Sequence, residues 1–230
     1  MTRDGIRMNL QVSNRAIFVL LVLTAACASR SSPRGSVQPI TLGAGGRPTA
    51  VTSISSSASR YTPADVEFMT GMIPHHAQAI LISRWAESHG ARRDVAVLAA
   101  RIIVAQSDEI ALIQAWLRTR NLPVPAADAT HHRMTMNGMT HDMLMPGMLT
   151  ADELKQLDAA RGSKWDRLFL TFMIRHHQGA LDMVDTLYAS PGTAQDEDVF
   201  RLAADVQADQ STEIARMEIM LAATPVGRAP

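Results

Sequence analysis

The stretch MIPHHAQAI, residues 72–80, has a near copy in MIRHHQGAL, residues 173–181. A second signature, QSDEI at 106–110, returns as QSTEI at 210–214. In both halves of the chain the paired histidines come first, and the glutamine and glutamate follow in the next helical segment. The repeat predicts two helical hairpins with the same polar signature, which pack most simply as a four-helix bundle.

Thr62 and Pro63 followed by Asp65, and the TADE pattern at 150–153, are helix-capping signals. With apolar periodicity they place four helices within a bundle domain at residues 62–223. No segment shows the alternation of apolar and polar residues that is typical of strands, so the predicted class is all-α. The expected helices are 63–89, 92–120, 151–189 with a bend near 162–163, and 195–223.

The first 26 residues have the features of an export signal. Three arginines precede the apolar run AIFVLLVLTAA at 16–26, which is short for a membrane span. The single cysteine, Cys27, follows in LTAAC, which resembles the lipobox of bacterial lipoproteins. We expect a signal peptide of the lipoprotein type over 1–26, lipidation of Cys27, and a periplasmic or outer-membrane-anchored protein. Ordinary signal cleavage nearby is the alternative.

Three other segments lie outside the expected helices. Residues 27–61 are rich in Ser, Gly, Pro and Thr, which predicts a flexible tether, and residues 224–230 form a short tail. The connection over 121–149 contains glycine and proline and has neither a continuous helical nor a strand pattern, so we expect a loop.

Two adjacent histidines on a helix diverge by about 100° and cannot both face one site squarely. The apolar stripe of the first helix is centred near His76, and the corresponding stripe of the third near His177. We therefore expect His76 and His177 to point into the bundle, with His75 and His176 at its edge.

The second and fourth helices carry polar groups on their apolar faces, Glu109 with Gln106 and Glu213 with Gln210. Burying a carboxylate without a partner costs several kcal/mol. A histidine from the opposite hairpin, or a metal ion, would offset that cost. The alternative is a set of hydrogen-bonded polar layers that fix helix register without any ligand.

These motifs resemble those of the domain-of-unknown-function 305 family over about residues 62–222. Its specific mark is the repeated Met-Ile-x-His-His, and MPGMLTADEL (145–154) leading into FMIRHHQGALDMV (172–184) adds to the resemblance. The resemblance implies a ferritin-like helical bundle in an exported bacterial protein, with copper binding in some members.

The spacing around the histidines indicates which metal would bind. Ferritin-like di-iron bundles use Glu-x-x-His, whereas here Met72 and Met173 stand three residues before the first histidine of each pair. A thioether in place of the carboxylate favours Cu(I), with Cu(II) open to the imidazoles. The candidate ligands in the helices are His75, His76, His176, His177, Met69, Met72, Met173, Met183, Glu109 and Glu213.

The connection contains HHRMTMNGMTHDMLMPGM at 131–148. Thioethers coordinate without losing a proton, so this segment can hold Cu(I) in an acidic, oxidising compartment. The alternative is a methionine-rich flap that packs on the bundle, an explanation that suits Met145 and Met148 better than the others. The candidate ligands here are His131, His132, Met134, Met136, Met139, His141 and Met143.

Composition and motifs narrow the function. The 22 basic and 22 acidic residues cancel, which leaves no electrostatic footprint for nucleic acid, and no motif for an organic cofactor is present. The sequence favours a non-enzymatic, exported copper-binding protein that sequesters or transfers copper, anchored to the membrane through Cys27, with a homo-oligomer left open. The alternatives are a ferritin-like metal-dependent oxidoreductase and a metal-free envelope interaction module.

Overall fold

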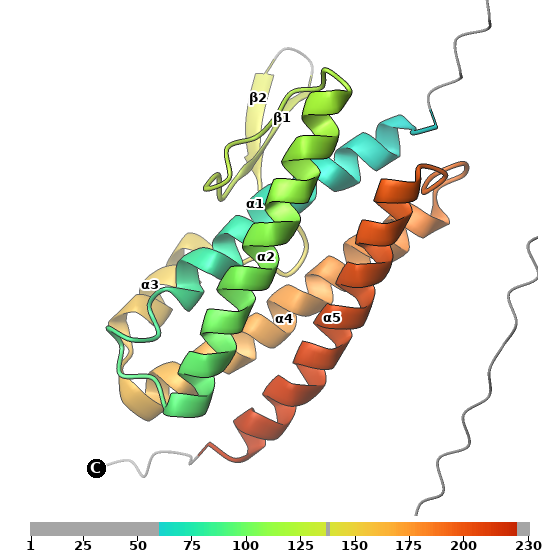
Figure 1. Cartoon of the computed structure of the whole chain (residues 1–230). Helices are drawn as coiled ribbons and strands as arrows, with labels where there is room; N and C mark the ends of the chain where they lie inside the picture. The colour runs from blue at the N-terminus through green and yellow to red at the C-terminus, as the bar shows by residue number, and fades with distance from the viewer. Residues whose placement is uncertain (1–59, 137–138, 225–230) are drawn as a thin grey trace, which may run out of the picture. The chain divides into compact units, whose positions relative to one another are not determined.

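The computed structural model describes residues 60–136 and 139–224. The expected signal peptide, Cys27 and nearly all of the tether fall outside these residues, as do residues 225–230 of the tail. In the part that is described, no helix combines the length and apolar character needed to cross a membrane. The elements in chain order are α1 (Pro63–Ser83), α2 (Arg93–Thr119), β1 (His132–Met136), β2 (Met139–Met143), α3 (Ala151–Ala159), α4 (Gly162–Ala189) and α5 (Glu197–Ala222), as Figure 1 shows.

The predicted helical class is confirmed for the described residues, and two helix starts follow the predicted capping signals. The side chains of Thr62 and Asp65 form a capping box at the start of α1. Thr150 and Glu153 form the same arrangement at the start of α3. In each box the side chains satisfy backbone N–H groups that the first helical turn leaves free.

Two predicted helix bounds are wrong. The first helix ends at Ser83 instead of residue 89, and the third is divided into α3 and α4. The backbone of Ala160 is extended between the two helices, and Gly162 has a φ of +57°. The amide of Gly162 donates to the carbonyl of His89, so the turns after α1 bind the start of α4. This hydrogen bond joins the segment that follows α1 to the break between α3 and α4, the two places where the predicted helices do not continue.

The expected loop over 121–149 contains a two-stranded antiparallel hairpin, so the prediction of a loop is wrong there. β1 pairs with β2 from His132↔Met143 to Met136↔Met139. The connecting residues 137 and 138 lie outside the described residues, but their sequence, Asn-Gly, is the one that favours a two-residue hairpin turn.

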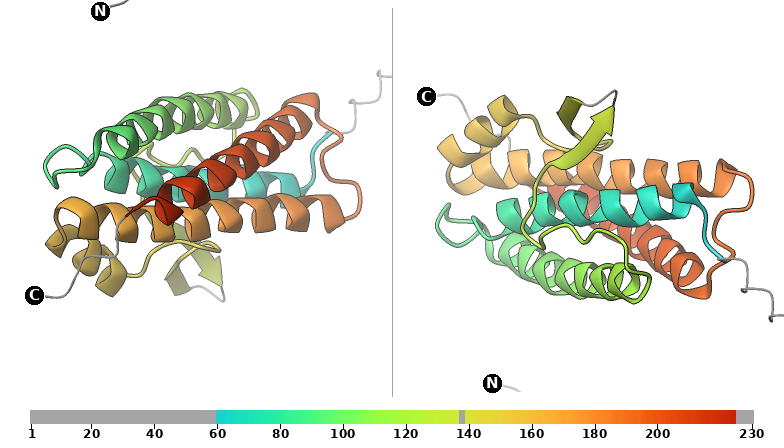
Figure 2. Two further views of the ribbon diagram at one scale, coloured as in Figure 1. Left: turned by 90° about the horizontal axis from the view of Figure 1, so that it is seen from below. Right: turned by 90° about the horizontal axis from the view of Figure 1, so that it is seen from above.

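The helices are arranged so that α1 and α4 occupy the middle. α1 packs on α2, α4 packs on α5, and α1 and α4 pack on each other. The two views of Figure 2 place α2 and α5 on one side of the α1–α4 layer, with the β hairpin and α3 on the other. A helix covered on two sides buries more than a single stripe, and α1 accordingly buries most of its residues.

The duplicated sequence produces a duplicated contact at the ends of the helices. Asp65 of α1 accepts a hydrogen bond of 2.7 Å from the amide of Ala194, in the α4–α5 connection. Its counterpart Asp166 of α4 accepts one of 3.1 Å from the amide of Arg92, in the α1–α2 connection. Both carboxylates are buried, and each ties one hairpin to the turn of the other.

Residues 145–149, here called the strap, cross the outer side of α1 and α4. The Gln78 side chain donates to the Leu149 carbonyl at 3.0 Å and accepts from the Leu149 amide at 2.7 Å. A Cβ atom added to Gly179 would lie 1.9 Å from the Pro146 oxygen, so the strap needs a glycine beneath it. The counterpart of Gln78 in the second repeat is this glycine.

We expect Gly179→Ala to lower the free energy of unfolding by about 2 kcal/mol, because the new methyl group would overlap the backbone of the strap. Gly71→Ala is the matched control: its Cβ would meet the flexible ends of two side chains, Met145 at 2.7 Å and Met183 at 3.4 Å, and no backbone atom closer than these. Alanine also favours helices over glycine by up to about 1 kcal/mol, so this control should be neutral or stabilising. Urea denaturation of both variants tests the contact, and equal stabilities would contradict it.

Candidate metal centre

The four paired histidines lie at the centre of the helices and are fully buried. His76 and His177 were expected to be buried, and this is confirmed. His75 and His176 were expected at the edge, and this is wrong because both side chains are 0% exposed. The strap and the opposing helix cover the side of α1 and α4 that a simple bundle would leave at the rim.

His75 and His176 face each other across the α1–α4 contact. Their ring centroids are 3.9 Å apart at an interplanar angle of 43°. The His75 Nε2 atom lies 3.0 Å from the Pro146 oxygen and must donate to it, since a carbonyl only accepts. His75 therefore carries its proton on Nε2, which leaves Nδ1 as the free lone pair.

His76 and His177 reach the outer helices. His76 Nε2 lies 2.6 Å from Glu109 Oε2 on α2, and His177 Nε2 lies 2.7 Å from Glu213 Oε2 on α5. The sequence left two partners open for each carboxylate, a histidine of the opposite hairpin or a metal ion, and the histidine found here is neither. The partner comes from the neighbouring helix of the same hairpin, because α1 packs along α2 and α4 along α5.

Burial keeps His75 and His176 neutral. It lowers the pKa of His75 to about 3, and a positive charge on His76 would lower it further. Burial, and then the neighbouring His75, hold the pKa of His176 well below its ordinary value. A neutral imidazole offers a lone pair to a metal ion, whereas a protonated one does not.

Many polar atoms in this region have no hydrogen-bond partner among the described residues. They include Nδ1 of His75, His76 and His177, both ring nitrogens of His176, both amide atoms of Gln106, and Oε1 of Gln210. Buried polar atoms are almost always partnered in folded proteins. An unsatisfied set of this kind, duplicated between the two repeats, fits the binding of a ligand between the helices.

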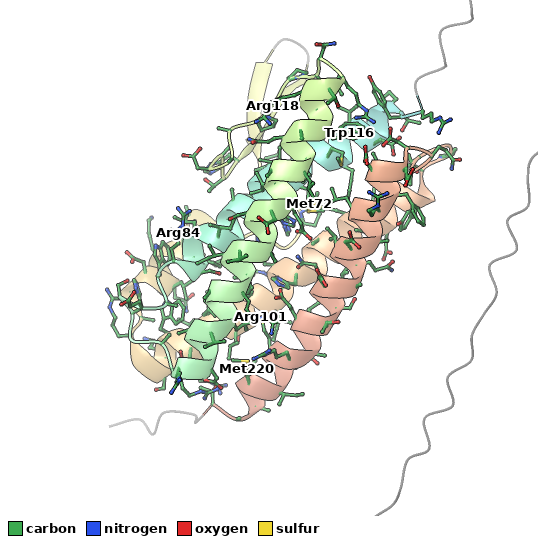
Figure 3. All side chains as sticks on the ribbon, in the orientation of Figure 1. Met72, Arg84, Arg101, Trp116, Arg118 and Met220 are labelled. Carbon is green, nitrogen blue, oxygen red and sulfur yellow. The ribbon has the colours of Figure 1, made fainter. Side chains whose placement is uncertain are left out.

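The side chains near the histidines limit which groups could bind a metal ion there. Among the side chains that the structure describes, no three His, Cys, Asp or Glu groups lie close enough together to hold a metal ion. Thioethers and amides in the helices are further potential donors beside the imidazoles. The candidate thioethers on the two central helices, α1 and α4, are Met69, Met72, Met173 and Met183, and all four are buried in the two apolar clusters. Figure 3 labels Met72 among the helices.

The packing of these methionines explains their burial without a metal. Met69, Met72 and Met183 belong to one apolar cluster and Met173 to the other. On α4, His176 and His177 separate the residues of the two clusters. Coordination by the methionines stays a prediction, as does coordination by Glu109 and Glu213, whose side chains are 12% and 18% exposed.

For most candidate ligands in residues 131–143, the structure describes the backbone but not the side chain. His131 is exposed, and its Nδ1 lies 3.2 Å from the Thr130 hydroxyl. Met143 is 42% exposed. Met148 is buried, and its sulfur accepts from the amide of Met145, so these two methionines do pack in the strap. The side chains outside the described set are those of His132, Met134, Met136, Met139 and His141.

No pattern in the sequence predicted that the strap crosses the helices or that Gln78 holds it. A signal was present in the difference between the repeats, AQAI against QGAL, which exchanges a glutamine for a helical glycine. A glycine inside a helix frequently marks the close approach of another backbone segment.

The neutral histidines should make stability depend on pH. The folded pKa of His75 and His176 lies below the unfolded value of 6.5, so the unfolded chain binds more protons between the two values. Stability is complete above that range and falls as the pH drops below 6.5. We expect each histidine to cost about 2 kcal/mol between pH 8 and pH 5. Urea denaturation with a chelator present measures this.

The control for this pH dependence is the double variant His75→Gln with His176→Gln, which keeps polar side chains of similar size but removes both titrating groups. Its free energy of unfolding should change less between pH 8 and pH 5 than that of the parent protein. The same slope in both proteins would show that other groups cause the dependence.

Solved structures of similar sequence and fold include two proteins that bear on the site. A DUF305 protein from Streptomyces coelicolor is 29% identical, with a TM-score of 0.58 over 73% of this chain and 96% of its own. CopM in its Cu(II)-bound form is 28% identical, with a TM-score of 0.52 over 68% of this chain and 95% of its own. CopM has also been solved in a Cu(I)-bound form.

Comparison with curated proteins gives a shorter match. The uncharacterized protein L153 of Acanthamoeba polyphaga mimivirus is 36% identical over 58 residues, which span 25% of this chain and 38% of that protein. The family profile of the domain of unknown function DUF305 matches residues 65–221, which include α2, α3, α4 and nearly all of α1 and α5. Since that match covers more than half of the chain, the protein belongs to the DUF305 family.

Proposed function

We propose that this protein binds copper in the bacterial cell envelope and sequesters it or passes it on. The observation that carries the proposal is the pair of repeated His-His segments, which are buried and have ring nitrogens with no partner among the described residues. CopM, which has a similar fold and sequence, is known in Cu(I)-bound and Cu(II)-bound forms. Copper is the cargo in this proposal, not a catalytic group.

The helices that hold these histidines are proposed to form a ferritin-like four-helix bundle of two repeated hairpins. The packing of α1 on α2 and of α4 on α5 supports this arrangement. In the bundle, His76 with Glu109 and His177 with Glu213 occupy equivalent positions, 2.6 and 2.7 Å apart, and of the two pairs only His177 with Glu213 has hydrogen-bond geometry. The carboxylates would orient the imidazoles, and the ring Nδ1 atoms would remain for a metal ion.

The chemistry of the remaining donors supports Cu(I) over harder ions. The segment 131–143 supplies thioethers and imidazoles, ligands that suit Cu(I) and bind poorly to magnesium or manganese. Because thioethers need no deprotonation, such a site works in an acidic envelope. Imidazoles would also accept Cu(II), so oxidation need not release the metal.

The location is proposed from the N-terminal sequence. Export through the signal over 1–26 and lipidation of Cys27 would tether the protein to a membrane through residues 27–61. The protein would then meet copper outside the cytoplasm, and it would do so without any cysteine free to oxidise.

A Cu(I) titration of the full chain against a chromophoric chelator tests the proposal. Met134→Leu with Met136→Leu and Met139→Leu should weaken binding at least tenfold, because leucine keeps the apolar bulk and removes the thioether. His76→Gln with His177→Gln should remove a further, separate part of the uptake. The matched control, Met217→Leu with Met220→Leu, changes two buried α5 methionines outside the candidate set and should bind like the parent.

Two outcomes would contradict the proposal. The parent protein could take up neither Cu(I) nor Cu(II), with stability indifferent to copper and to chelators. Alternatively, all three variants could bind like the parent, which would place the copper elsewhere in the chain.

A further inference from the structure

We propose that the donors of the connection hold a soft monovalent cation, Cu(I) or Ag(I), on one face of the β1–β2 hairpin. This inference rests on the proposed copper binding and specifies how the ion is held. The ion is then bound by one face of a two-stranded hairpin and not by a loop that wraps around it. The other face of the hairpin, the inert face, takes no part in binding.

The register of the hairpin carries the inference. The paired positions are His132↔Met143, Arg133↔Asp142, Met134↔His141, Thr135↔Thr140 and Met136↔Met139. Successive residues of a strand belong to opposite faces, and directly paired residues belong to the same face. Every methionine and histidine of the two strands therefore occupies a position on a single face. The other face has only arginine, threonine and aspartate positions.

The spacing of these positions suits one small ion. Paired residues on one face of an antiparallel ladder have Cβ atoms about 5 Å apart. The next pair on that face lies two residues along, about 7 Å away. The four central positions, Met134, His141, Met136 and Met139, therefore form a rectangle of about 5 by 7 Å. Its donors are three thioethers and one imidazole, with no carboxylate, which selects for Cu(I) or Ag(I).

The base of the hairpin is fixed to the helices. β1 contacts α1, and β2 ends at Met143, directly before the strap. The strap is held by the Gln78 amide at Leu149 and by His75 at Pro146. Strand pairing already fixes the backbone positions of the donor residues, so binding costs less backbone freedom than in a free loop, and the face should bind more tightly than the same residues unpaired.

An exchange of neighbouring residues tests the face directly, because it keeps the composition of the hairpin. The variant combines Met134→Thr with Thr135→Met, and Met139→Thr with Thr140→Met. It moves two thioethers to the opposite face. Ag(I), which does not oxidise under these conditions, is titrated into the full chain in competition with a thioether ligand. We expect binding at least tenfold weaker than in the parent.

The matched control exchanges the charged pair of the inert face, Arg133→Asp with Asp142→Arg. It leaves every donor in place and should bind Ag(I) like the parent. A second variant, Met134→Leu with Met139→Leu, keeps both strands apolar on the same face, and it should lose as much affinity as the exchange does. A loss of affinity in this variant would come from the missing thioethers, because the apolar pattern of the hairpin is kept.

The outcomes separate the two proposals. Parent-like binding by the exchange variant, or by the leucine variant, would overturn the one-faced site and leave copper binding intact. Equal weakening in the charge-exchange control would also overturn it, because the inert face would then contribute. If the parent itself took up neither Ag(I) nor copper, the proposed function would fail first.

Discussion

The contact of α1 with α4 beneath the strap is the constraint on which the other features depend. The rings of His75 and His176 meet there, and the Pro146 carbonyl accepts the proton of His75. Enclosing polar rings in this way is costly unless they stay neutral, and burial lowers the pKa of both groups accordingly. The same enclosure that makes the imidazoles neutral also makes them competent to coordinate a metal ion.

The strap also breaks the equivalence of the two repeats. His76 with Glu109 and His177 with Glu213 remain equivalent, as do Asp65 and Asp166 at the helix ends. Where the strap crosses, one repeat has Gln78, whose side chain binds the strap backbone, and the other has Gly179, which leaves room for it. The strap is therefore an asymmetric segment in an otherwise duplicated arrangement, and it connects the histidines to the methionine-rich hairpin.

The two groups of candidate ligands differ in physical character. The histidines of the helices are buried and satisfied only in part, so a ligand there must enter a closed interior. His131, directly before the hairpin, and Met143, at the end of β2, are both exposed, which suits first capture of an ion. Imidazole and carboxylate pairs inside, with an exposed thioether at Met143, fit the proposal that one molecule receives Cu(I) and retains copper in either oxidation state.

The sequence by itself determined the helical class, the repeated His-His segments, the capped starts at Thr62 and Thr150, and the burial of His76 and His177. These follow from signals within a few residues or from the period of a helix. The tertiary structure decided the burial of His75 and His176, the break before α4 and the pairing within each hairpin. The reason is distance along the chain: Pro146 and Leu149 reach α1 from 71 residues away, and no local pattern encodes which face they cover.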